Sequence, residues 1–275
     1  MTLLMIWKEA NVERIWLVSD SRLSNAGEAG GHTAFTDRAA KILEIPAILS
    51  GPRTPKACPT RSVSIGFAYT GSTLIALQAY TAVLPLWSRL ETTQVSTLPS
   101  IKEFAEHLKI FMEAYAHEMG SNGHDVGCQC VLVGPNDPTG VLDAWLVETK
   151  VENGCFTALS RQLNFLSSNY VELLGSGRTM AAERLMKIAP NGEAWSREPL
   201  RMIRDYLGED RAGSVGGAVQ IGIATEVGCE MHFDVQPLTV GKPLGTPFVA
   251  MTYRGFDFFK IGRIGDAFIT LRGIT

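Results

Sequence analysis

The chain has 275 residues, of which 45% are hydrophobic and 19% are charged, and its formal net charge is −3. This balance gives no electrostatic reason to expect nucleic acid or an anionic membrane as a partner. The longest apolar stretch, 74–87, is interrupted by Gln78 and Pro85, so we expect no membrane-spanning helix. The N-terminus has no signal-peptide pattern and the five cysteines are scattered, which favours a cytoplasmic protein with reduced thiols.

In chain order, the pattern predicts strands, then helices, then strands again. The first strands are expected to pair as two hairpins, at 3–9 with 15–23 and at 41–46 with 63–70. A helical pattern follows Gly71. Ser100 and Glu103 form a capping box ahead of apolar residues at helical spacing, which predicts a second helix ending at Gly120.

The second half of the chain is also expected to contain both helices and strands. Two short helices are expected at about 179–187 and 198–206. The expected strands are 128–133, 141–148, 218–225, 230–235 and 248–253. No repeat or low-complexity linker divides the chain, so the simplest assembly is one domain with two helical layers over largely antiparallel sheets.

Thr2 follows the initiator methionine directly and precedes a strand-like run. A small second residue allows methionine aminopeptidase to remove Met1. The hydroxyl of Thr2 would then be a nucleophile, and its free amine, with a reference pKa of about 8, could accept the proton. Many proteins begin with Met-Thr for no chemical reason, so this signal needs support from the rest of the chain.

An ordered set of motifs gives that support. Thr2, Ser19-Asp20-Ser21-Arg22, the strand beginning at Lys41 and Gly71 at a strand-to-helix turn together resemble the N-terminal half of a proteasome β-type subunit. The later turns, Gly175-Ser176-Gly177 and Val215-Gly216-Gly217, resemble two turns of the same family. The resemblance covers roughly residues 2–235.

The resemblance implies both a fold and an assembly. The fold is α+β, a four-layer αββα sandwich of two antiparallel sheets of the N-terminal nucleophile hydrolase type. The domain would span 2–237, with 238–275 as an extension packed on it. The resemblance also implies a homo-oligomeric ring and is compatible with a partner unfoldase, although no residue pattern indicates one.

The resemblance also assigns roles to individual residues. Thr2 would attack an amide or ester carbonyl, and Lys41 would place a cation beside its hydroxyl and amine. Asp20 would hold Lys41 through a charge-assisted hydrogen bond. The backbone N–H of Gly71 would face the developing oxyanion. Ser176 would polarise the terminal amine.

Each residue also has a structural interpretation. Asp20 could pair with Arg22 at a strand end, and Lys41 could be a solvated lysine of an edge strand. Gly71 could simply start a helix, and Ser176 could be a helix cap. The two glycines at 216–217 are structural under either interpretation.

One departure weakens the case for catalysis. Active members of the family place an aspartate three residues before a serine that precedes Gly-Gly. Here Val215 holds the serine position and the nearest acid is Asp210. Ser214 reaches that position only with a shift of one residue.

We therefore expect a threonine-nucleophile amidohydrolase, a peptidase that works through an acyl-enzyme and acts on a peptide or small amide. Two alternatives remain open: a catalytically inactive scaffold or binding subunit, and a small-amide acylase on the same fold. No cofactor or metal is expected, because the histidines have no ligand spacing; His107 and His117 lie ten residues apart on one helix.

Overall fold

A computed structural model describes residues 2–26, 32–50, 60–92, 97–165, 170–189, 194–209, 214–237, 249–264 and 267–275. Met1 and Asp210 lie outside these residues. Within the described ranges, no helix is both long enough and apolar enough to cross a membrane.

The first sheet contains the N-terminal hairpin and most of the C-terminal strands. Its order is β11-β1-β2-β12-β13-β14-β15, and β18 lies parallel to β13. The strands are β1 (Leu4–Lys8), β2 (Ile15–Asp20), β11 (Val171–Leu174), β12 (Val219–Thr225), β13 (Gly228–Pro237), β14 (Val249–Tyr253), β15 (Phe256–Asp257) and β18 (Arg272–Ile274).

The second sheet comes from the middle of the chain. Its order is β10-β9-β8-β6-β5-β7, antiparallel except for the short β5–β7 pair. The strands are β5 (Ile42–Ser50), β6 (Arg61–Gly71), β7 (Leu90–Glu91), β8 (Cys128–Asn136), β9 (Val141–Glu152) and β10 (Cys155–Gln162). Two small hairpins are separate, formed by β3 (Leu23–Ala26) with β4 (His32–Thr36) and by β16 (Arg263–Ile264) with β17 (Ala267–Phe268).

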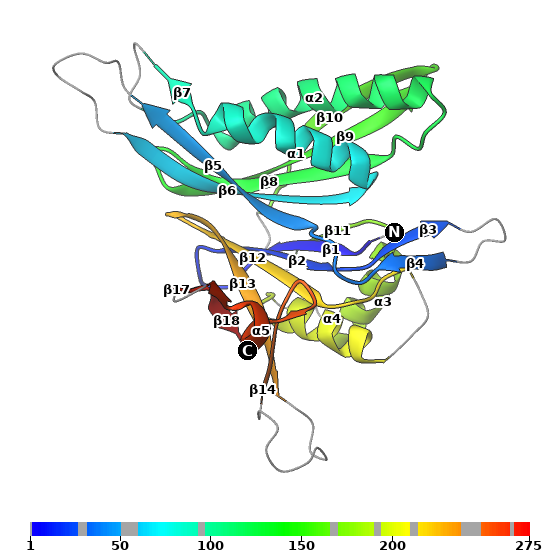
Figure 1. Cartoon of the computed structure of the whole chain (residues 1–275), viewed down its shortest axis with the longest axis vertical. Helices are drawn as coiled ribbons and strands as arrows, with labels where there is room; N and C mark the ends of the chain where they lie inside the picture. The colour runs from blue at the N-terminus through cyan, green and yellow to red at the C-terminus, as the bar shows by residue number, and fades with distance from the viewer. Residues whose placement is uncertain are drawn as a thin grey trace.

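The two sheets face each other, and helices lie outside them (Figure 1). Helices α1 (Thr73–Trp87) and α2 (Ile101–Ser121) pack on the second sheet. Helices α3 (Arg178–Ile188) and α4 (Glu198–Gly208) cover the first sheet. A short helix, α5 (Phe258–Ile261), follows β15.

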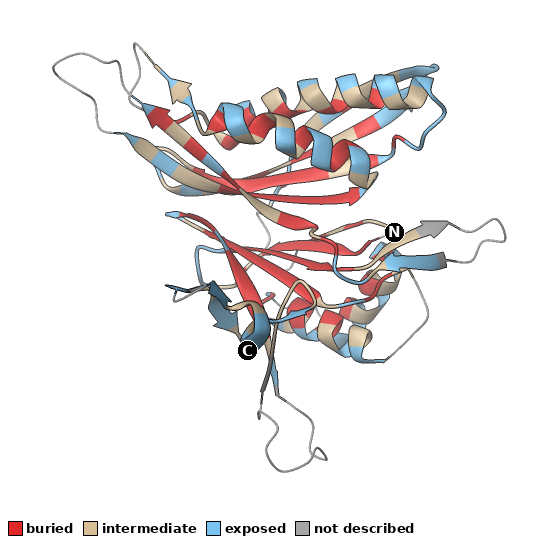
Figure 2. Ribbon diagram, in the orientation of Figure 1, coloured by how far each residue is buried: buried red, intermediate tan, exposed pale blue. Residues whose placement is uncertain are grey.

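Three apolar cores lie between these layers. The middle core joins the sheets, with Leu4 and Leu17 from the first sheet and Ala68 and Val131 from the second. Each outer core lies between a sheet and its helices. Because the first sheet is covered on both faces, every residue of β2 is buried, as Figure 2 shows for the facing strands. Trp7 and Trp16 stack across β1 and β2 with ring centroids 5.5 Å apart.

The α+β class is confirmed, and so is the capping box at the start of α2. Ser100 Oγ accepts a hydrogen bond from the Glu103 N–H, while the Glu103 carboxylate accepts one from the Ser100 N–H at 2.7 Å. The expected helices and strands are present at nearly the expected positions.

The expected pattern omitted several strands, most of them short; two of these, β10 and β11, are edge strands of the two main sheets. β10 is an edge strand with mostly exposed or half-buried residues, so it lacks a clear apolar alternation. β11 has only four residues. After residue 237 the chain returns to the first sheet through β14 and β18. The domain boundary at 237 stays a prediction.

Candidate active site

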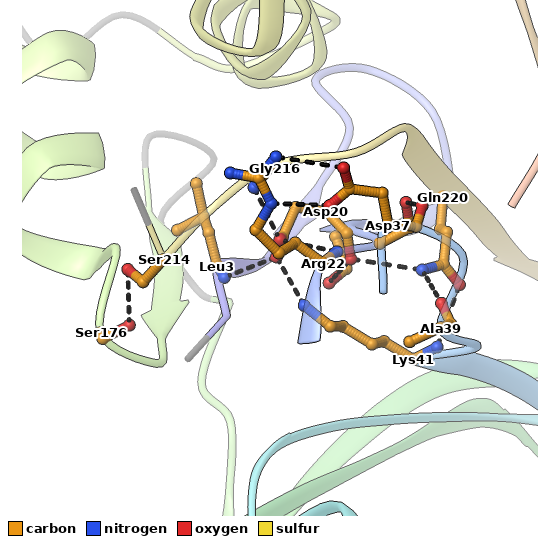
Figure 3. A network of polar contacts seen from close by, with 12 residues as sticks. Leu3, Asp20, Arg22, Asp37, Ala39, Lys41, Ser176, Ser214, Gly216 and Gln220 are labelled. Atoms are coloured by element: carbon orange, nitrogen blue, oxygen red, sulfur yellow. Dashed lines mark hydrogen bonds and ion pairs between the residues drawn. The ribbon is translucent and has the colours of Figure 1, made fainter. Parts of the chain in front are cut away.

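Asp20 is the centre of a buried polar network at the end of β2 (Figure 3). Its carboxylate accepts four hydrogen bonds, two on each oxygen. Oδ1 accepts from Lys41 Nζ and from the Leu3 N–H, both at 2.9 Å. Oδ2 accepts from the Arg22 N–H at 3.1 Å and the Gly216 N–H at 3.0 Å. A carboxylate that is removed from water but fully hydrogen-bonded can remain charged in the core.

Lys41 lies directly before β5, and its side chain has 0% exposure. The interpretation as a solvated edge-strand lysine is therefore wrong. Burial lowers the pKa of the Lys41 ammonium, and the Asp20 carboxylate opposes this shift by attraction and hydrogen bonding. The pair is a buried ion pair whose two members depend on each other.

Arg22 does not pair with Asp20 through its side chain. Its guanidinium instead binds the Asp37 carboxylate through two contacts, at 2.6 and 3.1 Å. That contact lowers the pKa of Asp37, chiefly through the hydrogen bond from Arg22. Asp20 does end β2 and does pair with Arg22, but the contact is made by the Arg22 backbone N–H, while the guanidinium binds Asp37.

Gln220 joins this network from β12, although it belongs to none of the motifs in the sequence. Its Oε1 accepts from the N–H of Lys41 at 3.0 Å and of Ile42 at 3.4 Å. Its Nε2 donates to the backbone carbonyls of Asp20 at 3.2 Å and Ala39 at 2.8 Å. In the sequence, the one signal for Gln220 was a long polar residue within a mostly apolar strand. In the structure its side chain is 3% exposed, so its polar atoms need partners within the protein.

The Thr2–Leu3 peptide is held on both sides. The carbonyl of Thr2 accepts from the Gly177 N–H at 3.2 Å, while the Leu3 N–H donates to Asp20. Gly175 makes this close approach possible: its φ is +86°, and a Cβ there would lie 2.1 Å from the Thr2 carbonyl oxygen. The backbone at Thr2 is therefore fixed relative to the Asp20–Lys41 pair.

Thr2 also lines a cavity of about 1060 Å³ together with Gly71 and Ser176. Gly71 has a φ of +84°, and a Cβ there would lie 2.1 Å from the carbonyl oxygen of Gly127. No other residue type fits this turn without moving the backbone. The structure thus brings the five predicted residues into two adjoining groups: the Asp20–Lys41 pair, and the three residues of the cavity wall.

Ser176 and Ser214 meet at the open side, where their hydroxyl oxygens are 3.4 Å apart. Val215 is 4% exposed and belongs to the core between the first sheet and its helices. It packs so tightly that a Cβ on Gly177 would lie 2.7 Å from its side chain. Ser214, rather than residue 215, is therefore the residue of this turn that faces Ser176.

The arrangement combines elements that acyl-transfer chemistry needs. It has a hydroxyl on a fixed backbone, a buried ammonium that shares Asp20 Oδ1 with the Leu3 N–H, and a glycine turn beside the same cavity. The catalytic roles of Thr2, Asp20, Lys41, Gly71 and Ser176 stay predictions.

The sequence matches no protein-family model and no curated protein. Solved structures do match the fold. Anbu (ancestral beta-subunit) from Yersinia bercovieri aligns with a TM-score of 0.52 and 14% identity, covering 82% of this chain and 83% of that one. A helical assembly of the Anbu complex from Pseudomonas aeruginosa aligns with a TM-score of 0.51 and 16% identity, covering 84% and 86%. An Anbu mutant from Hyphomicrobium sp. strain MC1 aligns with a TM-score of 0.51 and 12% identity, covering 82% and 83%.

These neighbours correct the family assignment made from the sequence. They are Anbu proteins, which are proteasome-like but form a distinct family, so the assignment to proteasome β-type subunits is wrong. The motifs behind that assignment are short turns around glycine and single polar residues, which are too short to identify a family.

Proposed function

We propose that this chain is an amidohydrolase whose nucleophile is the hydroxyl of Thr2, exposed when the peptide bond before Thr2 is cleaved. The observation that carries the proposal is the buried Asp20–Lys41 pair, which is hydrogen-bonded to the N–H of Leu3, the residue after Thr2. A buried ion pair costs desolvation energy and is weak evidence for stability alone. Its position behind a threonine in a cavity wall favours a catalytic role.

The chain's own residues would carry the reaction in two steps. The Thr2 hydroxyl loses its proton to its own amine as its oxygen attacks the substrate carbonyl carbon. The tetrahedral intermediate collapses, the amine product leaves with the proton, and an ester on Thr2 remains. Water then attacks the ester, the amine again takes the proton, and the acid product leaves as the Thr2 hydroxyl is restored.

Lys41 and Gly71 would stabilise the charges that form in these steps. The Lys41 ammonium lowers the cost of removing the hydroxyl proton and depresses the pKa of the neighbouring amine by like-charge repulsion. The N–H of Gly71 would donate to the oxyanion; losing one such donor typically costs about 3 kcal/mol of barrier. The layers of helix, sheet, sheet and helix would form the four-layer αββα sandwich that holds these groups in place.

We propose a peptide as the substrate, because the cavity beside Thr2 is large enough for several side chains. We also propose that the chain assembles with copies of itself. The neighbour from Pseudomonas aeruginosa is described as a helical assembly, which supports self-association in a protein of similar fold. Light scattering on the purified chain would test for the assembly.

The test of the nucleophile is covalent labelling. Protein whose N-terminus is Thr2, verified by intact mass, is incubated with a β-lactone or epoxyketone probe. We expect a single adduct that maps to Thr2 and is lost in Thr2→Ala but kept in Thr2→Ser. A protein with a free Thr2 that gains no adduct would contradict the proposal.

One observation favours an alternative, a scaffold or binding subunit without catalysis. Val215 is fixed in the core, so the turn beside Ser176 offers one hydroxyl, that of Ser214, and no buried serine at 215. The same labelling experiment separates the two functions. An unreactive Thr2 in a folded, assembled protein would favour the scaffold, and an adduct would exclude it.

A further inference from the structure

Two carboxylates, Asp125 and Glu148, belong to the described wall of the Thr2 cavity. His124 lines the cavity as well, and neither lysine nor arginine is among its described lining residues. A cleft with walls of low dielectric and one sign of charge concentrates the field and attracts ligands of the opposite sign.

The two carboxylates differ in how far they are already balanced. Glu148 is 3.2 Å from Lys150 Nζ and accepts a hydrogen bond from Gln129 at 3.2 Å. Asp125 Oδ1 accepts a hydrogen bond from the Gly127 N–H at 3.0 Å. Within the part of the chain that the structure describes, Asp125 forms no ion pair. Asp125 is therefore the carboxylate available to a ligand.

Asp125 is fastened close to the turn at Gly71. The carbonyl of Gly127, two residues further on, accepts from the Ser72 N–H at 2.7 Å. The same carbonyl fits directly against Gly71, where a Cβ would come within 2.1 Å of it. The position of the Asp125 carboxylate is thus tied, through Gly127, to the turn beside which the reacting carbonyl would bind.

The same cavity offers apolar surface as well as charge. Leu74, Met119 and Phe35 line it together with the two carboxylates. Lysine and arginine side chains combine an aliphatic stem with a cationic head, so they match a wall of this composition. An acidic substrate side chain would be repelled by the two carboxylates.

We propose that the cavity selects peptides with a lysine or arginine side chain next to the bond that is cleaved, and that Asp125 is the counter-ion that recognises it. This specificity rests on the proposed threonine-nucleophile function. Asp125 is a specificity residue in it and takes no part in the bond changes at Thr2.

The test compares three fluorogenic peptide amides that differ only in an arginine, leucine or glutamate before the scissile bond. We expect kcat/KM to be highest for the arginine substrate, lower for leucine and lowest for glutamate. Asp125→Asn keeps an acceptor for the Gly127 N–H but removes the charge. It should lower kcat/KM for the arginine substrate by about 10-fold and leave the leucine substrate within about 2-fold. Asp125→Lys should reverse the order of arginine and glutamate.

A matched control is Glu118→Gln, which removes a carboxylate from the exposed surface of α2 outside the cavity lining. It should leave all three values unchanged. An arginine-to-glutamate ratio that is the same in wild type and Asp125→Asn would overturn the inference, while probe labelling of Thr2 would show that the proposed function still holds. Absence of both turnover and labelling would overturn both.

Discussion

The two sides of the Thr2 site are built in opposite ways. The buried side, formed by Asp20, Lys41 and Gln220, has exposures of 0%, 0% and 3%, and its polar groups are hydrogen-bonded to one another and to the backbone. The open side, formed by Asp125, Ser176 and Ser214, faces the cavity or the surface; among the described residues its side-chain hydrogen bonds are one from the Gly127 N–H to Asp125 and one between the two serine hydroxyls. The difference indicates that the buried side fixes the geometry of the nucleophile, whereas the side chains of the open side are free to contact the substrate.

The largest effect on stability is expected from Lys41→Met, which breaks the pair on the buried side. It leaves the Asp20 carboxylate buried without its cation, and such a change typically costs about 3–5 kcal/mol. Urea denaturation measures the loss. Lys109→Met, which removes a lysine 3.9 Å from Glu106 on α2, is the control and should change stability by less than about 0.5 kcal/mol. An equal loss of unfolding free energy in the two variants would contradict the structural role assigned to the buried pair.

A smaller loss is expected from Gln220→Leu. The substitution keeps the volume but leaves the N–H of Lys41 and the carbonyl of Ala39 without a partner, at a cost of about 1–3 kcal/mol. The rate constant for labelling of Thr2 by bound probe should fall by a larger factor than the affinity for the probe, because the substitution displaces the backbone of Lys41. Gln78→Leu on the exposed surface of α1 is the control. A labelling rate equal to that of wild type would contradict a positioning role.

The pH dependence of probe labelling tests the role of Lys41 on the buried side without any substitution. The rate should rise as the Thr2 amine becomes neutral. It should then fall as Lys41 loses its proton. Burial lowers the pKa of Lys41, so the stabilising cation is present below that lowered pKa and is lost as the pH rises through it. The fall should therefore begin below the pH at which an exposed lysine titrates. A rate that stays constant through that range would contradict the role of the ammonium.

The smallest effect is expected from Ser214→Ala on the open side. Its hydroxyl contact with Ser176 is 3.4 Å long and exposed, so its loss should change stability by less than about 0.5 kcal/mol. A fall of more than about 10-fold in the labelling rate with unchanged stability would show that this pair takes part in the chemistry. The open side would then have a catalytic role as well as a role in specificity.

Local patterns in the sequence were enough to predict most of the elements. The capping box of Ser100 and Glu103 and the apolar spacing of α2 are properties of neighbouring residues, and the structure has both. Two strand-like apolar runs close together in the chain likewise predicted the β1–β2 hairpin. The pairing of Arg22 with Asp37 and the fourfold hydrogen bonding of Gln220 depend on residues that only the folded chain brings together. Short motifs also gave the wrong family, because they describe turns and not the whole chain.

The wide sequence separation within the Asp20 network has a consequence during protein synthesis. Lys41 and Gln220 are 179 residues apart, and Asp20 and Gly216 are 196 apart. Translation proceeds at about 5–20 residues per second, so Asp20 and Lys41 wait on the order of ten seconds or more for their partners from β12 and the turn before it. A nascent or truncated chain that ends before residue 216 therefore holds the threonine but lacks the framework around it. The network is completed only after Gly216 and Gln220 have been made.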